Sequence, residues 1–319
     1  MRTPDRGMNS LKPKKLRAGQ LIGLIAPAGP VLPPERISRA VIYLEKQGYR
    51  VILGRHVEAQ HGFLAGEDDV RLTDLNGMLR NPEVRMIMAL RGGYGCIRLL
   101  NGIDYASVRR DPKIIVGFSD VTALQLALYH KTRLVTFAGP MAAVEFSNPP
   151  DPLTEEHFWK AVTTARPLGG IPSSGTFLHQ PQTEVEGLLL GGNLATITSL
   201  VGTPFLPKFK DSILLLEEVD ERPYRIDRML SQLRLAKVHR GLRGLILGQF
   251  TNCENLDPTR PSATCAEVLE SFATMISVPT LNGILHGHVA RKVTLPLGVR
   301  ARFKQRGSKL EILESALTP

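Results

Sequence analysis

The sequence predicts an α/β protein built in two parts. In residues 21–139, short uninterrupted apolar segments alternate with segments whose apolar residues recur every three or four positions. Uninterrupted apolar strands separated by helices are typical of a parallel sheet with helices on both faces. A stretch rich in Pro, Gly and Ser follows at 147–182, and the remainder mixes strands with helices. The length of 319 residues suits two domains of ordinary size.

The first half contains five expected strands with helices between them. The strands are residues 21–26, 50–54, 85–90, 113–117 and 133–139. The first expected helix carries Ile37, Ala40, Val41 and Leu44 on one face and ends at Gly48. A second helix carries Leu72, Leu75 and Leu79, a short one lies near 97–100, and another begins at about residue 120.

The second half has a mixed α/β core of its own. Strands are expected at 184–190, 212–219 and 244–250, and helices at 193–202, from Pro223, and at 262–275. Two period-two segments, 299–303 and 309–313, predict a closing hairpin around the turn "QRGS" at 305–308. We therefore expect an N-terminal domain at 15–150, a linker or crossover at 151–182 and a C-terminal domain at 183–319. One long surface loop would explain the linker composition equally well.

Charge and cysteine content narrow the class of protein. The net charge is +10, but residues 1–17 carry +5 and residues 291–309 carry +7, so the rest of the chain is close to neutral. This distribution favours a solvated tail and a basic hairpin over nucleic-acid binding. Three cysteines without a CxxC pair predict neither a disulfide framework nor a zinc site. The apolar run "LIGLI" is too short for a signal peptide or a membrane span, so we expect a cytoplasmic protein.

The segment "KIIVGFSDVTAL" places Ser119 where a strand turns sharply into a helix. Such a corner lies above the carboxyl edge of the sheet, where open α/β folds bind ligands. An exposed hydroxyl beside the amide of Asp120, at a helix N-terminus, suits an acyl-transfer nucleophile and its oxyanion. A helix N-cap is the simpler explanation of this stretch by itself. The G-x-S-x-G signature is also incomplete, because Val121 replaces its last glycine.

A second loop at the same edge strengthens the hydrolase hypothesis. "ALRGGYGCIRLL" puts three glycines in a turn after the strand at 85–90. Glycines allow backbone amides to converge on a developing negative charge. We expect Gly93 to be the second oxyanion donor, with Gly92 as the near alternative.

A serine nucleophile needs a base and an acid that orients the base. Among the eight histidines, His286 and His288 lie together in a glycine-flanked loop. The apolar strand "SILLLEEV" ends in Glu217 and Glu218, and adjacent strand residues face opposite sides. Only one of these two carboxylates can therefore face a cleft.

Six ordered segments resemble the LD-carboxypeptidase family of serine peptidases, which includes the microcin-immunity peptidases. They are "IGLIAPAGP", "ALRGGYGCIRLL", "IIVGFSDVTAL", "GLLLGGNLATITSLVGTP", "ILLLEEVDERPYRIDRML" and "GHVARKVTLPLG". The resemblance implies an N-terminal flavodoxin-like parallel-sheet domain and a C-terminal mixed, β-rich domain, with the active site at their interface. It also implies a homodimer and no metal or cofactor.

The same resemblance implies a Ser-Glu-His triad made of Ser119, Glu217 and His288. The oxyanion amides map to Gly93 and Asp120. His286 departs from the family pattern, which more often has a nonpolar residue there. Arg91 is a candidate for holding a substrate carboxylate, although no motif supports it.

The function implied is hydrolysis of the L,D amide bond between the diamino acid and terminal D-alanine of murein tetrapeptides, during peptidoglycan recycling. One alternative is an immunity-type peptidase that cleaves aminoacyl-nucleotide antibiotics, which tends to carry an aromatic-bearing insertion. Here the region 147–182 supplies few aromatic residues, among them Trp159 and Phe177, which favours the murein peptide. The other alternative is a non-catalytic peptide-binding relative. The third residue of the stem peptide, meso-diaminopimelate or lysine, is left open.

Overall fold

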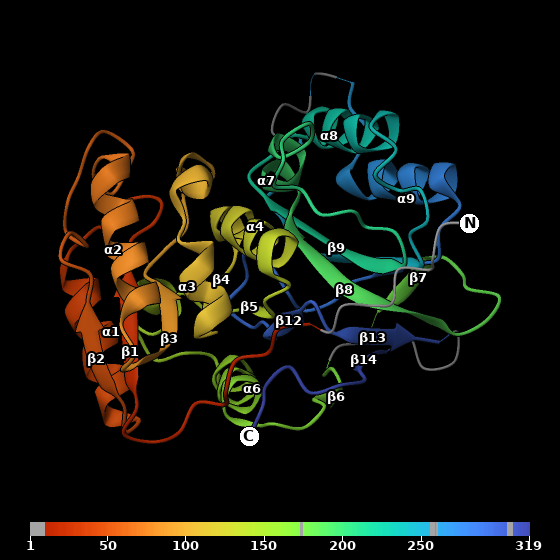
Figure 1. Cartoon of the computed structure of the whole chain (residues 1–319). Coiled ribbons are helices and arrows are strands. Elements are labelled where there is room, and N and C mark those ends of the chain that lie inside the picture. The colour runs from red at the N-terminus through yellow and green to blue at the C-terminus, as the bar shows by residue number, and fades with distance from the viewer. Residues whose placement is uncertain (1–9, 173–174, 256–258, 260, 305–308) are drawn as a thin grey trace.

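The computed structural model describes residues 10–172, 175–255, 259, 261–304 and 309–319. The N-terminal half of the chain is built on a six-stranded sheet, in which the strands follow the order β12-β5-β4-β3-β1-β2 (Figure 1). The strands are β1 (Leu21–Ile25), β2 (Arg50–Leu53), β3 (Val84–Ala89), β4 (Ile114–Gly117), β5 (Thr136–Ala138) and β12 (Leu295–Leu297). Strands β1 to β5 run parallel in the order of a flavodoxin-like sheet. The predicted fold class is confirmed for this half.

Helices cover both faces of this sheet, as expected from its uninterrupted apolar strands. They are α1 (Glu35–Lys46), α2 (Asp68–Arg80), α3 (Tyr105–Arg110), α4 (Thr122–Thr132), α5 (Ala142–Glu145) and α6 (Pro152–Thr163). Apolar residues of α2, α3 and α4 belong to one buried cluster, and those of α1, α5 and α6 belong to another. The short helix expected near 97–100 is a 3₁₀ turn at Cys96–Gly102.

The C-terminal half forms an eight-stranded mixed sheet in the order β6-β14-β13-β8-β9-β10-β11-β7. The strands are β6 (Gly169–Gly170), β7 (Thr176–His179), β8 (Val185–Asn193), β9 (Ser212–Val219), β10 (Gly244–Thr251), β11 (Thr280–Asn282), β13 (Arg300–Phe303) and β14 (Leu310–Ile312). Helices α7 (Leu194–Ser199), α8 (Pro223–Leu235) and α9 (Cys265–Ile276) pack on one face. The mixed, β-rich character predicted for this half is confirmed.

Strand β12 connects the two halves of the chain. It follows the histidine loop in sequence, yet it pairs antiparallel with β5 at the edge of the N-terminal sheet. The chain then returns to the second sheet, where the Leu189 amide donates to the Val299 carbonyl. Because the segment before β12 must reach the first sheet, the histidine loop lies beside the ends of β4 and β5. Helix α4 lies between the sheets and contacts β8 and α7 (Figure 1).

The stretch expected to be a linker contains regular structure. Helix α6 begins there, with the Asp151 side chain accepting from the amides of Leu153 and Thr154. Trp159 of α6 stacks on Tyr49 with ring centroids 5.0 Å apart, and its indole donates to the Tyr43 hydroxyl. The contacts of Trp159 with Tyr49 and with Tyr43 of α1 therefore hold α6 in place, and the domain limits at 150 and 183 stay a prediction.

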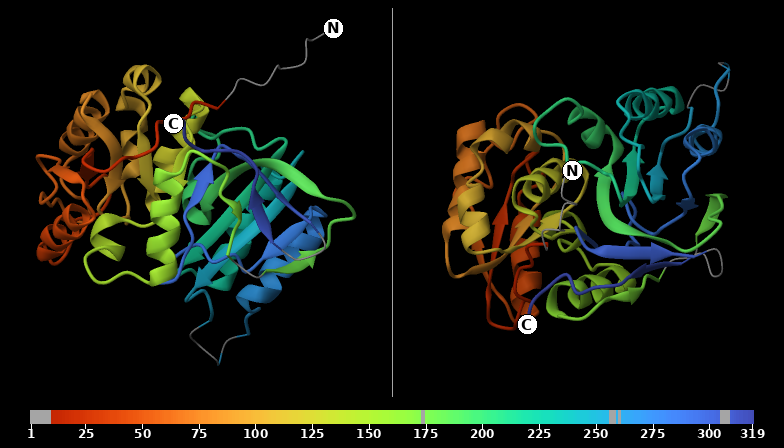
Figure 2. Two further views of the ribbon diagram at one scale, coloured as in Figure 1. Left: turned by 90° about the horizontal axis from the view of Figure 1, so that it is seen from below. Right: turned by 45° about the vertical axis from the view of Figure 1, so that its right-hand side comes forward.

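Each of the two buried clusters extends across both sheets. Along β9, Leu214 and Leu216 belong to one cluster, and Ile213 and Leu215 belong to the other. This alternation follows from the two-residue period of a strand. The halves are further tied together where residues 13–15 run beside Thr318 near the C-terminus (Figure 2).

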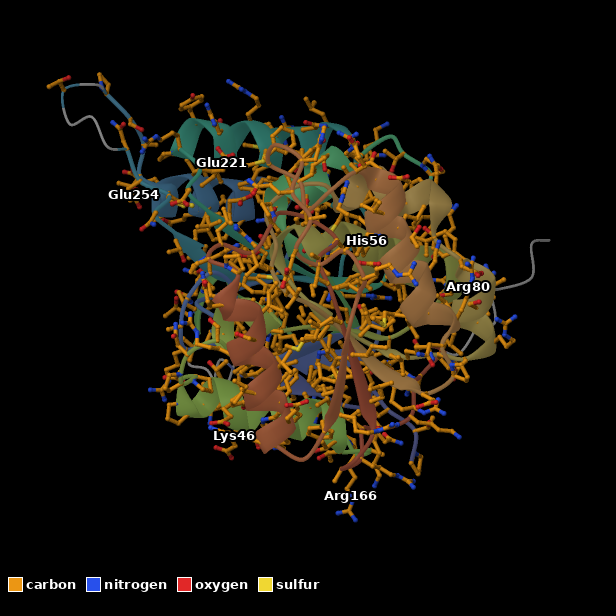
Figure 3. All side chains as sticks on the ribbon, turned by 90° about the vertical axis from the view of Figure 1, so that its left-hand side faces the viewer. Lys46, His56, Arg80, Arg166, Glu221 and Glu254 are labelled. Carbon is orange, nitrogen blue, oxygen red and sulfur yellow. The ribbon has the colours of Figure 1, made fainter. Side chains whose placement is uncertain are left out.

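Charge on the closing hairpin is largely paired. Arg300 bonds to Glu186, Arg302 to Glu184 and Glu311, and Lys304 to Glu184. Figure 3 shows side chains of both signs over the surface, with Lys46 and Arg166 at one end and Glu221 and Glu254 at the other. The expected turn at 305–308 lies outside the described residues. Within the described ranges, no helix is long and apolar enough to cross a membrane.

Candidate active site

Ser119 occupies the sharp corner that the sequence predicts. Its φ of 61° lies in the left-handed region, which a non-glycine residue adopts at a cost of about 1–3 kcal/mol. The corner is tight because Gly117 has no side chain: a Cβ there would lie 2.8 Å from a methyl of Val121. In this chain Gly117, two positions before Ser119, lets the backbone pass close to the Val121 side chain. Val121 can therefore stand where the G-x-S-x-G signature has a glycine.

The structure brings together the three side chains predicted from distant segments. Ser119 Oγ lies 2.9 Å from His288 Nε2, and His288 Nδ1 lies 2.8 Å from Glu217 Oε2. A carboxylate only accepts hydrogen bonds, so the Nδ1 proton of His288 points to Glu217 and Nε2 is free to accept from the serine hydroxyl. The Phe118 ring, 4.9 Å from the imidazole centroid, packs beside His288.

Glu217 is held in a fully buried position at the end of β9. Two glycines make room for it. A Cβ on Gly287, whose φ is +133°, would lie 3.1 Å from Glu217 Oε2, and a Cβ on Gly248 would lie 3.2 Å from Glu217 Cβ. Oε1 of this carboxylate has no hydrogen-bond partner in the described part of the chain.

The neighbouring Glu218 points the other way, as strand alternation requires. Its carboxylate accepts from Asn193 Nδ2 and from the Ala195 amide, both at 2.8 Å, at the start of α7. Burial raises the pKa of Glu218 above its usual value. Glu218 therefore anchors α7, and Glu217 alone of the pair faces His288.

His286 lies in the same loop as His288 but contacts a different group. Its Nδ1 donates to the Val293 carbonyl at 3.0 Å, the residue is fully buried, and burial lowers its pKa. Burial thus favours the neutral form of His286, and the side chain contacts the Val293 carbonyl instead of the triad.

The glycine loop approaches the serine from the other side. A Cβ on Gly92 would lie 3.0 Å from Ser119 Cβ, so the backbone passes directly over the corner. Gly93 has a φ of +119°. Across the described turns and loops, neither the Gly93 amide nor the Asp120 amide donates a backbone hydrogen bond. Both amides predicted for the oxyanion are thus uncommitted, while Gly92 makes the closest approach to Ser119.

The side chain of Asp120 ties the two loops together. It accepts from the Cys96 amide at 2.8 Å and is buried, and burial raises its pKa. The Gly92 carbonyl in turn accepts from the Gly29 amide at 3.1 Å, after β1. The loops after β1, β3 and β4 are therefore joined at one sheet edge.

A cavity of about 450 Å³ opens beside Ser119 and His288. Its walls come from the glycine loop, α5, the start of α6 and the histidine loop, and include Arg91, Met141, Val144, Glu145, Asp151 and Lys292. Lys292 and Glu145, which the sequence reasoning missed, form a 2.5 Å ion pair there. The basic residue four positions after His288 was visible in sequence, but nothing local indicated its partner. A larger hollow of about 930 Å³ around Tyr224 contains none of the predicted site residues.

No group of three or more His, Cys, Asp or Glu residues close enough to hold a metal ion occurs in the described ranges. A hydroxyl, an imidazole and a buried carboxylate in hydrogen-bonded series, with free amides opposite, define the class of serine hydrolases.

Comparison with known proteins narrows this class. Residues 22–139 match the LD-carboxypeptidase N-terminal domain, and residues 186–303 match the C-terminal domain of the same family. The chain belongs to the LD-carboxypeptidase family, and the prediction of a serine carboxypeptidase is confirmed at that level.

The similarity to known relatives extends over nearly the whole length of the chain. A probable murein peptide carboxypeptidase of Bacillus subtilis is 35% identical over 98% of both chains. The structure of muramoyltetrapeptide carboxypeptidase from Oxalobacter formigenes is 31% identical, covers 94% of this chain and 100% of its own, and has a TM-score of 0.80. That of a microcin C7 self-immunity protein, an inactive mutant in the apo state, is 28% identical, covers 97% and 100%, and has a TM-score of 0.88.

Proposed function

We propose that this protein hydrolyses the amide bond between the diamino acid and the terminal D-alanine of murein tetrapeptides, with Ser119, His288 and Glu217 as its triad. The observation that carries the proposal is the position of the His288 ring, 2.9 Å from the Ser119 hydroxyl and 2.8 Å from the Glu217 carboxylate. The names of two relatives, a murein peptide carboxypeptidase and a muramoyltetrapeptide carboxypeptidase, support the substrate class.

The reaction begins with the serine hydroxyl. Neutral His288 accepts the Ser119 proton at Nε2 while the oxygen attacks the scissile carbonyl. Glu217 holds the Nδ1 proton and stabilises the imidazolium that forms. His288 then gives its Nε2 proton to the leaving D-alanine nitrogen, and a water molecule, activated by the same imidazole, hydrolyses the acyl-enzyme.

The tetrahedral intermediate carries a negative oxygen that needs donors. We assign this role to the amides of Gly93 and Asp120, which belong to the two loops joined by the Asp120–Cys96 hydrogen bond. Removal of one such donor costs about 3–4 kcal/mol of transition-state stabilisation.

A second candidate substrate is an aminoacyl nucleotide, because the microcin C7 self-immunity protein is a structural neighbour. The aromatic side chains expected to stack on a base in such an enzyme are engaged elsewhere here. Trp159 packs on Tyr49 and Tyr43, and Phe177 packs near Phe303. These contacts favour the murein peptide.

The cellular setting belongs to the same proposal. The proposed enzyme is cytoplasmic and trims tetrapeptides to tripeptides during peptidoglycan recycling, which suits a chain in which Cys96, Cys253 and Cys265 form no disulfide. That it acts as a homodimer is part of the proposal and rests on the family resemblance alone.

Incubation of the purified protein with a free tetrapeptide tests the function. D-alanine release by the wild type, together with its loss in Ser119→Ala, is the expected result. The same pair is incubated with an aminoacyl sulfamoyl adenylate to measure the alternative. Release of D-alanine that survives in Ser119→Ala would reject the nucleophile. A wild type that turns over neither substrate would favour a non-catalytic peptide-binding protein.

A further inference from the structure

We propose that Arg91 binds the α-carboxylate of the substrate's terminal residue and thereby restricts the enzyme to the C-terminal bond. This inference rests on the proposed function and names the group that recognises the end of the peptide. It follows from the charges that line the cavity beside Ser119, which include two cations and two carboxylates besides His288.

The first cation in the cavity is already neutralised. Lys292 is only 2% exposed, and its ammonium lies 2.5 Å from Glu145 Oε1 and 4.1 Å from the centroid of the Phe118 ring. The other oxygen of Glu145 accepts from the Met141 amide at 2.7 Å. Both members of this pair are held by the protein, so Lys292 contributes no unpaired charge to a ligand.

The second carboxylate that lines the cavity, Asp151, accepts hydrogen bonds from backbone amides. Asp151 caps α6, where one oxygen accepts from the amides of Leu153 and Thr154 at 3.0 and 3.2 Å. A carboxylate at a helix N-terminus is compensated by the partial positive charge there. Lys292 and Glu145 therefore neutralise each other and backbone amides compensate Asp151, whereas the guanidinium of Arg91 has no ion pair in the described part of the chain.

Arg91 is held by the backbone of the turn that follows β1. Its Nη1 donates to the Pro30 carbonyl at 3.0 Å, the hydrogen bond that the structure gives this guanidinium. Its Cζ lies 3.8 Å from where a Cβ on Gly29 would stand, so the head group rests close to the glycine turns. A guanidinium has five N–H donors in a planar fork, and a carboxylate matches two of them.

Arg91 lies where the carboxylate of a C-terminal residue is expected to bind. Arg91 directly precedes Gly92 and Gly93, the loop that passes over Ser119. In a terminal amino acid, one Cα separates the scissile nitrogen from the carboxylate carbon, through two bonds of about 1.5 Å each. The carboxylate site must therefore border the oxyanion site. Arg91 Nη2 lies 4.0 Å from where a Cβ on Gly93 would stand, so the guanidinium is close to the residue assigned as an oxyanion donor. Met141 and Val144 supply apolar wall for the alanine methyl.

The experiment pairs an enzyme change with a substrate change. The substrates are a tetrapeptide ending in D-alanine and the same peptide ending in D-alaninamide, and the enzymes are wild type, Arg91→Gln and Arg91→Lys. A charge-assisted hydrogen bond predicts that wild type prefers the free acid by about 10- to 100-fold in kcat/KM. We expect Arg91→Gln to reduce that preference below about threefold and to leave the rate on the amide within about threefold. Arg91→Lys keeps part of the preference.

Arg98→Gln is the matched control, since Arg98 is an exposed arginine nearby that pairs with Asp68. It should keep the full preference for the free acid. Equal loss on both substrates in Arg91→Gln would mean that Arg91 only supports the loop, and an unchanged preference would mean that it does not contact the carboxylate. Either result overturns the inference while leaving the proposed function intact.

Binding measurements separate this inference from a failure of catalysis. In a Ser119→Ala background, calorimetry compares the affinity for the two peptides with and without Arg91→Gln. Tighter binding of the free acid that depends on Arg91 supports the inference even if the proposed reaction is wrong. Equal affinity for acid and amide with Arg91 present overturns it.

Discussion

Replacing Glu217 by Gln removes one negative charge next to His288 and preserves the size of the side chain. Glu217 is fully buried, with Oε2 2.8 Å from His288 Nδ1 and Oε1 without a partner in the described residues. An amide that turned its oxygen to His288 would leave two N–H donors unsatisfied in that buried space. The amide nitrogen is therefore expected to face Nδ1. This orientation moves the imidazole proton to Nε2, where it blocks transfer from Ser119.

The size of the effect has two parts. Loss of a charge-assisted hydrogen bond costs about 1.5–3 kcal/mol, or roughly 10- to 150-fold in rate. The wrong tautomer raises the loss to about 10⁴-fold, as in the Asp-to-Asn change of the chymotrypsin-type triad. We expect kcat for D-alanine release from tetrapeptide to fall by at least about 10²-fold, toward 10⁴-fold, with an unchanged far-ultraviolet circular dichroism spectrum.

Glu218→Gln is the matched control for this prediction. Glu218 is adjacent and buried, but its carboxylate serves Asn193 and the start of α7. Its substitution should lower the free energy of unfolding and leave kcat within about tenfold of the wild type. If Glu217→Gln retains more than a tenth of the wild-type kcat, the role assigned to this carboxylate is wrong.

Two further changes probe the corner and the acid stability of the fold. Gly92→Ala puts a methyl 3.0 Å from Ser119 Cβ, which should displace the serine and lower kcat/KM about 10- to 100-fold. Because Gly92 does not have a positive φ, an alanine there should change Tm little. Activity equal to that of the wild type would contradict the close approach of Gly92 to Ser119. Burial, with a smaller contribution from Lys160, lowers the pKa of His157 to about 4, below the unfolded value near 6.5. The unfolded chain therefore binds more protons between these values, and about 3 kcal/mol of stability should be lost as pH falls from 6.5 to 4. Urea unfolding at pH 7 and pH 4.5 should show a smaller loss in His157→Gln; an equal loss in both proteins would reject this assignment.

Much of the scaffold could be predicted because its signals are local. The apolar runs at 21–26 and 113–117 become β1 and β4, and the helix expected from Pro223 is α8. Each of these elements is set by the period of its own apolar residues. The same holds for the corner at Ser119, where a strand meets a helix within a few positions.

Helix α6 lies within the stretch predicted to be a linker or crossover, and that division of the chain stays a prediction. The density of proline and glycine between 147 and 182 drew attention away from the helix, which starts with an Asp151 N-cap followed by Pro152. Phe158, Ala161 and Val162 then bury one face of the helix. The spacing of these apolar residues was the signal that could have found it.

The sequence by itself determined the class of fold, the serine corner and the fact that one carboxylate of the pair at 217–218 had to face a cleft, because each depends on neighbouring residues. The local pattern left open which of the two carboxylates faces the cleft, and the family resemblance implied Glu217. The tertiary structure brings Glu217 to His288, because pairing of β12 with β5 carries the histidine loop across to the first sheet while Glu218 turns to α7. It also decided that Lys292 is neutralised by Glu145 while Arg91 is left with its charge unpaired, since the partners lie on segments that no local pattern connects.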